Sequence, residues 1–268
     1  MLISKSFRRV RRMRRNVKSL ACAAALLTAA FAYFGTPGQS PAAPSILGPW
    51  SSSPAPAQPQ SGPLPDPAAK GHYVDALAAL ATLPIKGKAP KTGYDRAKFG
   101  PAWSDDVTVP GGHNGCDTRS DNLRANMTDV IIKPGTNGCT PLSGILYDPY
   151  SNTTLHFQRG RETSSLVQLD HLVPLAESWQ KGSQQWDADK RRNFANDPAN
   201  LQLTIGSLNT QKAASDVASW LPPYKAYRCT YVSPIIGVKA TYGLWVTQPE
   251  HDVMAAILTK CAAGAPGR

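Results

Sequence analysis

Apolar residues recur with two different periods along the chain, and the two periods predict two kinds of element. Short runs rich in Val, Ile, Thr, Leu and Phe, bounded by Gly, Pro, Asn or Asp, are typical of strands. A turn at residues 148–152 separates two of these runs. The predicted strands span residues 130–133, 144–148, 153–158, 166–169 and 201–205.

Other segments carry apolar residues at helical spacing. In the first of them, Leu77 and Leu80 share one face, and Pro84 follows its end. Pro222 and its neighbour stop a later helix, and Thr247 is a plausible N-cap for the last one. The predicted helices span residues 73–83, 122–127, 175–180, 188–194, 207–220, 224–242 and 248–261.

The order of these elements predicts an α+β fold. Strand 166–169, strand 201–205 and helix 207–220 form a strand–strand–helix (ββα) core. Helices 175–180 and 188–194 make an insertion between the two strands of this core. The earlier strands form a small N-terminal β-containing region, and the remaining helices are additions.

The first 70 residues differ in composition from the rest. A basic stretch from Lys5 to Lys18 precedes an apolar stretch from Leu20 to Phe34, so residues 1–35 are expected to be a signal peptide or an N-terminal membrane anchor. Residues 36–70 are rich in Pro, Ala and Ser, which predicts a disordered linker before a folded domain at 71–263. The domain is therefore expected to be exported, either secreted or anchored to the outer face of a bacterial cytoplasmic membrane.

Four of the five cysteines lie in the exported part, and an even number there indicates disulfides. Three pairings are possible. The pairing that is local in the sequence, Cys116–Cys139 with Cys229–Cys261, is favoured. A zinc site is the rival interpretation, but the chain has no C-x-x-C spacing.

The net charge of +11 overstates how basic the domain is. The first 32 residues hold eight of the 29 Lys and Arg residues and no acid, so the remainder carries only +3. Affinity for nucleic acid must then come from a local patch. Residues 190–192, Arg159 and Arg161 are candidates, although a solvated helix face is the simpler interpretation of 190–192.

One constellation of polar residues carries chemistry. Asp170 and His171 end a predicted strand, Asn200 precedes the second strand, and Asn209 lies at the start of the helix that follows. A carboxylate and an amide oxygen suit Mg²⁺, with Mn²⁺ also accepted. A neutral imidazole can deprotonate water. Asn200 would orient that imidazole.

Lys212 follows Asn209 by three positions, so the two side chains share a helix face. There Lys212 would meet a phosphate oxygen as a point charge. Each of these residues also has a structural interpretation: Asn200 as a turn residue, Asn209 as a helix cap and Lys212 as a solvated side chain.

At these residues the chain resembles the HNH (ββα-metal) endonucleases. The closest resemblance is to the branch named after the C-terminal domain of GmrSD restriction endonucleases, as found in secreted actinobacterial proteins. The resemblance implies that His171 is the general base, that Asp170 and Asn209 bind metal, and that Asn200 supports His171. The chain departs from the plain pattern by carrying Asn209 where many members have a metal-binding histidine. The stretches that carry the resemblance are residues 114–119, 169–175, 196–201, 207–212 and 220–223.

Arg119 lies in the first of these stretches. Its guanidinium would clamp a phosphate with two hydrogen bonds, and the alternative is an ion pair with Asp117 or Asp121.

Taken together, these observations predict an exported metal-dependent endonuclease that acts on DNA, or also RNA, with little sequence specificity. The alternative is a non-catalytic binding module, tethered to the envelope, that keeps the fold. A zinc-dependent hydrolase is a third option, which the absence of H-E-x-x-H argues against. Contact with a membrane is expected only through the N-terminal segment, and no protein partner is inferred.

Overall fold

The computed structural model describes residues 67–264, which belong to one compact unit. The predicted export segment at 1–35 and residues 36–66 of the predicted linker lie outside the described residues. Helix α1 (Pro67–Thr82) begins earlier than residue 73, so residues 67–70 are helical. Between residues 67 and 264, no helix has both the length and the apolar character needed to cross a membrane.

The described chain combines helices with two small antiparallel sheets, which confirms the α+β class. The strand predicted at 201–205 and the helix predicted at 175–180 have the expected bounds. The helices after α1 are α2 (Thr118–Asn126), α3 (Leu175–Gln180), α4 (Ala188–Asn196), α5 (Gly206–Lys212), α6 (Arg228–Tyr242) and α7 (Gln248–Ala262). The strands are β1 (Thr128–Ile132), β2 (Pro141–Asp148), β3 (Thr153–Gln158), β4 (Val167–His171) and β5 (Leu201–Ile205).

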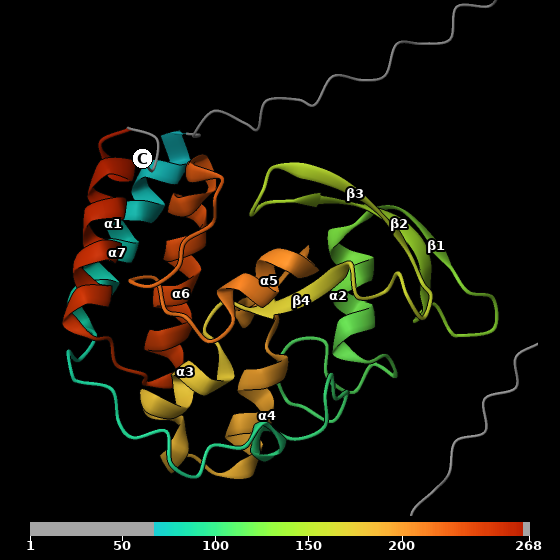
Figure 1. Ribbon diagram of the computed structural model, residues 1–268, viewed down its shortest axis with the longest axis horizontal. Coiled ribbons are helices and arrows are strands. Elements are labelled where there is room, and N and C mark those ends of the chain that lie inside the picture. The colour runs from blue at the N-terminus through green and yellow to red at the C-terminus, as the bar shows by residue number, and fades with distance from the viewer. Residues whose placement is uncertain (1–66, 265–268) are drawn as a thin grey trace, which may run out of the picture. The chain divides into compact units, whose positions relative to one another are not determined.

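The strands form two separate antiparallel sheets. One has the order β1-β2-β3, and the other is the pair β4-β5, in which Asp170 faces Gln202 and His171 faces Leu201. In Figure 1 the β4 strand and α5 lie between the three-stranded sheet with α2 on one side and α1, α6 and α7 on the other. The ββα unit β4-β5-α5 is therefore the centre of the described fold.

Two hydrophobic cores meet at the end of β4. Val167 and Leu169 pack into the smaller core, which α2, β2, β3 and β5 complete. Leu172 and Val173, directly after the strand, pack into the larger core among α1, α3, α4, α6 and α7. Asp170 and His171 thus lie where the chain passes from one core to the other, and burial on both sides fixes the backbone between them.

Two disulfides have the sequence-local pairing, which confirms that prediction and removes the zinc interpretation. Cys116–Cys139 links the loop before α2 to the segment before β2, and Cys229–Cys261 links α6 to α7. The linked residues are 23 and 32 positions apart. Each crosslink is expected to stabilise the fold by about 3–4 kcal/mol in the chain-entropy account.

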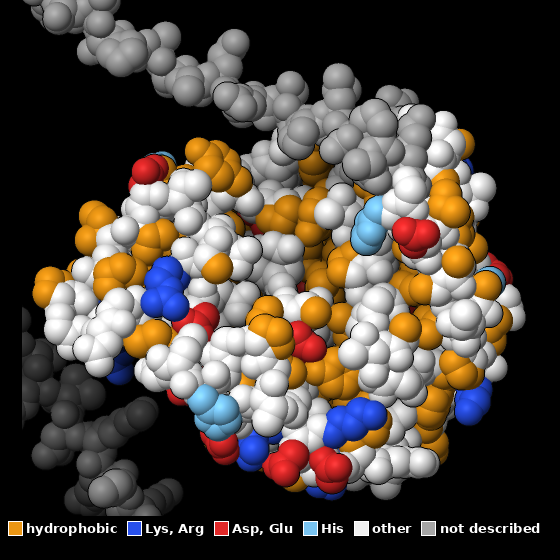
Figure 2. All heavy atoms as spheres, turned by 180° about the vertical axis from the view of Figure 1, so that it is seen from behind, with side chains coloured by type: hydrophobic (Ala, Val, Ile, Leu, Met, Phe, Trp, Pro, Cys, Tyr) orange, Lys and Arg blue, Asp and Glu red, His pale blue; other side chains and the backbone are white. Residues whose placement is uncertain are grey.

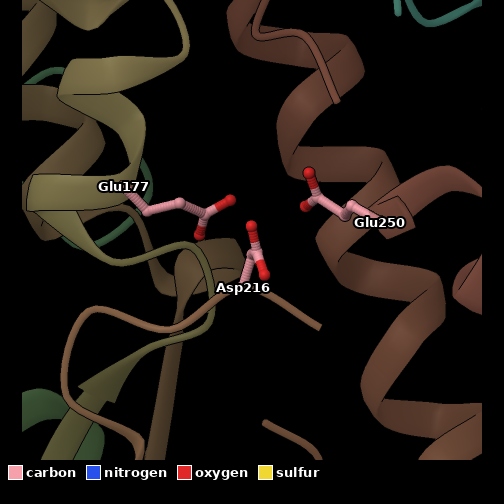
Figure 3. Close-up of side chains that lie close together, drawn as sticks. All are labelled: Glu177, Asp216 and Glu250. Carbon is pink, nitrogen blue, oxygen red and sulfur yellow. The ribbon is translucent and has the colours of Figure 1, made fainter. Parts of the chain in front are cut away.

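A buried ion cluster fastens the helical half of the molecule. Glu177 of α3, Asp216 after α5 and Glu250 of α7 point their carboxylates toward one another, with ligand atoms within 4.8 Å (Figure 3). The Lys181 ammonium bonds to all three, at 2.8, 3.0 and 2.5 Å respectively. Lys239 of α6 adds bonds to Glu177 at 2.6 Å and to Glu250 at 2.9 Å. Because ammonium groups already neutralise these acids, the cluster is a structural network.

The helix predicted at 207–220 is wrong at its C-terminal end, because α5 stops at Lys212. Ala213 adopts a left-handed backbone conformation with φ 50°, which terminates the helix. The chain then turns inward so that Asp216 reaches the ion cluster, where Lys181 and Lys88 each bind it at 3.0 Å. The predicted helix at 224–242 begins as a short 3-10 turn at Lys225–Tyr227 and continues as α6.

Candidate active site

Asp170, His171 and Asn209 come together at one cavity of about 270 Å³. Strand β4 supplies the first two residues, and the first turns of α5 supply the third. His171 also borders a second cavity, of about 240 Å³. Its walls come from the segment before α2, which includes Arg96 and Trp103, and from the end of α4. His171 is thus shared by two neighbouring cavities.

The imidazole of His171 is held in one orientation. Its Nε2 lies 2.9 Å from the backbone carbonyl oxygen of Ala195, which can only accept a hydrogen bond, so Nε2 carries the proton. Burial lowers the pKa of His171 to about 3, against the raising effect of the Ala195 hydrogen bond. The ring is therefore neutral near pH 7, and its Nδ1 is an unprotonated acceptor. The indole of Trp103 stacks on the imidazole with ring centroids 5.6 Å apart.

Asp170 is buried, and both of its carboxylate oxygens accept hydrogen bonds. Tyr150, which follows β2, donates its hydroxyl to Oδ2 at 2.7 Å, and the Lys212 ammonium donates to Oδ1 at 2.9 Å. Burial raises the pKa of Asp170, while Lys212 and Tyr150 lower it, and the net shift is upward. Tyr150 and Lys212 fix the position of the carboxylate at the cavity wall.

Lys212 does not face solvent, contrary to the expectation of an exposed contact with phosphate. Its side chain is 0% exposed, and its ammonium binds Asp170 and, at 2.6 Å, the backbone carbonyl oxygen of His171. The helix turn from Asn209 to Lys212 therefore directs one side chain to the cavity and the other into the protein. Lys212 acts as an internal counter-ion that joins α5 to the end of β4.

Asn200 does not bond to the imidazole as expected. Its amide oxygen accepts from the backbone N–H of Val173 at 2.8 Å, and its amide nitrogen donates to the carbonyl oxygens of Val173 and Phe194. Phe194 precedes Ala195, whose carbonyl holds the imidazole. Asn200 is fully buried and ties the end of α4 to the segment after β4, so its support of His171 passes through the backbone.

Asn209 is oriented by β4. Its amide nitrogen donates to Oε1 of Gln168 at 2.8 Å, which leaves its amide oxygen without a hydrogen bond among the described residues. This contact needs α5 to approach β4 closely at Gly206. A Cβ atom at that position would lie 2.3 Å from the carbonyl oxygen of Ser165, so only glycine fits there.

Arg119 is not a phosphate clamp in this structure. Its Nη2 donates to the carbonyl oxygens of Ser164 and Val167, at 3.0 and 2.8 Å. The expected alternative, an ion pair with Asp117 or Asp121, does not form either, because Asp117 caps α2 and Asp121 pairs with Arg124. Arg119 instead anchors the start of β4 to α2 and positions the strand that carries Asp170 and His171.

The donor set fits a hard divalent cation. Asp170 offers a carboxylate, and each of its two oxygens keeps a lone pair beyond the side-chain hydrogen bond that it accepts. The amide oxygen of Asn209 accepts no hydrogen bond among the described residues. Both residues line the 270 Å³ cavity, which has room for the waters and phosphate oxygens that complete the coordination of Mg²⁺ or Mn²⁺. The charge of Lys212 beside Asp170 makes this a weaker site than a free carboxylate would offer.

Four contributors to the site were missed by sequence reasoning. Tyr150 and Ala195 touch Asp170 and His171 from distant parts of the chain, and the backbone carbonyl of Ala195 has no sequence signal. Trp103 and Arg96 lie between α1 and α2, in a segment that carries no recognisable motif. The one sequence signal in this segment is a Trp in a stretch rich in Gly and Pro.

Comparison with known proteins identifies a family for this chain. Residues 117–257 match the family model of the C-terminal domain of GmrSD restriction endonucleases. A secreted protein of unknown function from Arthroderma benhamiae is 34% identical over 201 residues, covering 74% of this chain and 91% of that protein. No solved structure matches the chain.

Proposed function

This chain belongs to the family of GmrSD restriction endonuclease C-terminal domains, and we propose that it is an exported, metal-dependent endonuclease that hydrolyses phosphodiester bonds of DNA. The observation that carries the proposal is the protonation and orientation of the His171 imidazole. A neutral imidazole, with Nε2 committed to the Ala195 carbonyl and Nδ1 left as an acceptor, lines the same cavity as Asp170 and Asn209.

In the proposed reaction, His171 Nδ1 takes a proton from a water molecule as that water attacks the phosphorus atom. The bond from phosphorus to the leaving oxygen breaks and that oxygen takes a proton from solvent, so the products are a phosphate monoester end and a hydroxyl end. The low pKa of His171 keeps the ring ready to accept a proton, but makes it a weak base. A phosphate anion bound beside the ring would raise that pKa and strengthen the base.

Asp170 and Asn209 would hold the metal. A bound Mg²⁺ or Mn²⁺ would neutralise charge on the phosphate and stabilise the leaving oxygen. Tyr150 and Lys212 keep the Asp170 carboxylate in place, Gln168 orients Asn209, and Asn200 and Arg119 fix the backbone around them. In this account Asn200, Lys212 and Arg119 are positioning residues.

The substrate is nucleic acid with little sequence readout. On the face shown in Figure 2, the described Lys and Arg side chains are scattered singly and several lie beside acidic ones. Arg191 and Arg192 of the candidate patch at 190–192 bind backbone carbonyls and acidic side chains, so these two side chains form neither a free cationic patch nor a fully solvated helix face. Such a surface favours contacts with the phosphate backbone near the site over reading of bases.

Two observations support export. All four cysteines of the described chain are paired in disulfides, which persist in oxidising compartments. The related protein of Arthroderma benhamiae is a secreted protein.

The experiment is a nicking assay on supercoiled plasmid, with single-stranded DNA and RNA as parallel substrates. Purified oxidised protein is expected to nick the plasmid with Mg²⁺ or Mn²⁺ and to stop when a chelator is added. Binding of DNA without any cleavage, at every metal tested, would favour the alternative of a non-catalytic binding module.

A further inference from the structure

Arg96 holds a distinctive place beside His171. Among the described residues it is the one Lys or Arg residue that lines both of the cavities that His171 borders. It is the first residue of a 3-10 turn, Arg96–Phe99, that Asp95 caps and that the buried ring of Phe99 anchors to the larger core. The backbone at Arg96 is therefore fixed, with the residue in the wall of both cavities.

The side chain of Arg96 is free of internal partners. It is exposed and makes no hydrogen bond or ion pair within residues 67–264. Its charge nevertheless reaches the site: after burial and the Ala195 hydrogen bond, Arg96 is the next influence on the pKa of His171, which it lowers. A cation this close to a base, with no counter-ion of its own, leaves a place for an anion.

The other cations near the site are already used. Lys212 is fully buried against Asp170, and Arg119 binds two backbone carbonyls. Neither residue lines either cavity. A phosphodiester that enters beside His171 would therefore meet Arg96 as its first protein cation.

We propose that the Arg96 guanidinium binds a non-bridging oxygen of the scissile phosphate. This inference rests on the proposed nuclease function and adds a substrate-binding residue from outside residues 117–257, the region that matches the family. The planar fork of an arginine matches the oxygens of a phosphate, and its charge is retained at every working pH. Because Arg96 borders the same two cavities as the base, the phosphate that it binds is the one attacked by the water molecule that His171 deprotonates.

The first test measures binding without cleavage. A fluorescein-labelled DNA duplex is titrated in the presence of EDTA with wild type, Arg96→Gln and Arg96→Lys. The control is Lys133→Gln, which also removes one positive charge, at an exposed position that lines neither cavity. Arg96→Gln is expected to raise the Kd for DNA by about tenfold or more, the effect of losing a hydrogen bond to a charged group. The slope of log Kd against log salt concentration should fall in magnitude by about 1.

Arg96→Lys should fall between wild type and Arg96→Gln, because it keeps the charge and loses the fork. Equal effects of Arg96→Gln and Lys133→Gln on DNA affinity would overturn the proposal, as would a wild-type protein that does not bind DNA. This readout does not need hydrolysis, so a protein that binds through Arg96 but never cuts would contradict the proposed function alone.

The second test locates the contact at the scissile phosphate. Bis(4-nitrophenyl) phosphate has a single phosphodiester and no neighbouring phosphates. Arg96→Gln is expected to reduce kcat/KM on this substrate by about tenfold to a hundredfold, while Lys133→Gln leaves it unchanged. Weaker DNA binding combined with unchanged hydrolysis of the small substrate would overturn the assignment to the scissile phosphate.

Discussion

The indole ring of Trp103 lies almost parallel to the imidazole of His171, with an angle of 14° between the two planes. Trp103 holds this position with a left-handed backbone conformation, φ 58°, which is uncommon for a bulky residue. Thr118 of α2 supports the loop through its N–H to the Trp103 carbonyl and its hydroxyl to the Ser104 carbonyl. The imidazole is thus fixed by a hydrogen bond at one edge and by an aromatic ring on one face.

Replacing Trp103 by Ala should reduce kcat for plasmid nicking by about tenfold to a hundredfold, because the base then loses its fixed orientation. KM should change little, since Trp103 is argued to act on His171 and not on substrate. Trp103→Phe should recover part of the loss because it restores an aromatic face. An Ala variant with wild-type kcat and an unchanged unfolding midpoint would show that the stacking does not matter for catalysis.

Replacing Lys212 by Met should destabilise the protein by about 3–5 kcal/mol, because the buried carboxylate of Asp170 is left without its counter-ion. The double variant Lys212→Met/Asp170→Asn should recover part of that loss. Lys133→Met, at an exposed position after β1, is the control and should change stability by less than about 0.5 kcal/mol. Urea unfolding followed by circular dichroism measures all three. Equal stability of the Lys212 and Lys133 variants would contradict the role of Lys212 as counter-ion.

The limits of sequence reasoning show most clearly at α5. The bounds of β5 and the pairing of the cysteines followed from local patterns of apolar residues and spacing. The end of α5 did not, because residues 213–220 have helical composition and the contact that draws Asp216 inward comes from Lys181, far away in the sequence. The burial of Lys212 could not be predicted from the sequence for a similar reason. Spacing shows that it shares a helix face with Asn209, but only packing shows that its ammonium turns toward Asp170.

The buried ion cluster should make stability depend on pH. Burial raises the pKa of Asp216, but the charges of Lys181 and Lys88 lower it by more than burial raises it. The pKa of Asp216 therefore lies well below the ordinary value. A depressed pKa in the folded state stabilises the fold above the unfolded value, about 3.9 for Asp, and that contribution is lost as the pH falls below it.

Asp216→Asn should therefore be less stable than wild type near neutral pH, and the difference should shrink as the pH falls from about 4 toward 2. Asp75→Asn, at an exposed position on α1, should match wild type throughout. Thermal melts across this range make the comparison. A stability difference that stays constant down to the lowest pH would contradict the depressed pKa.

The two proposed metal ligands should contribute unequally. Asp170→Asn removes the only anionic ligand and should weaken Mn²⁺ binding severely, whereas Asn209→Ala should weaken it less because water can take the vacated position. Asn209→His should shift preference toward Zn²⁺ or Ni²⁺, since imidazole suits those ions. Calorimetric titration gives the affinities, with folding checked by circular dichroism. If Asp170→Asn binds Mn²⁺ as tightly as wild type does, Asp170 is not a ligand.

The central claim is that His171 is the general base, and single-turnover cleavage of a labelled DNA duplex at saturating protein and metal tests it most directly. His171→Ala should lower the cleavage rate by at least about a hundredfold, the scale of general-base catalysis, with unchanged DNA affinity and a folded circular dichroism spectrum. His156→Ala, which replaces an exposed histidine on β3 that lines neither cavity, should cleave at the wild-type rate. Cleavage by folded His171→Ala at the rate of His156→Ala would contradict the account.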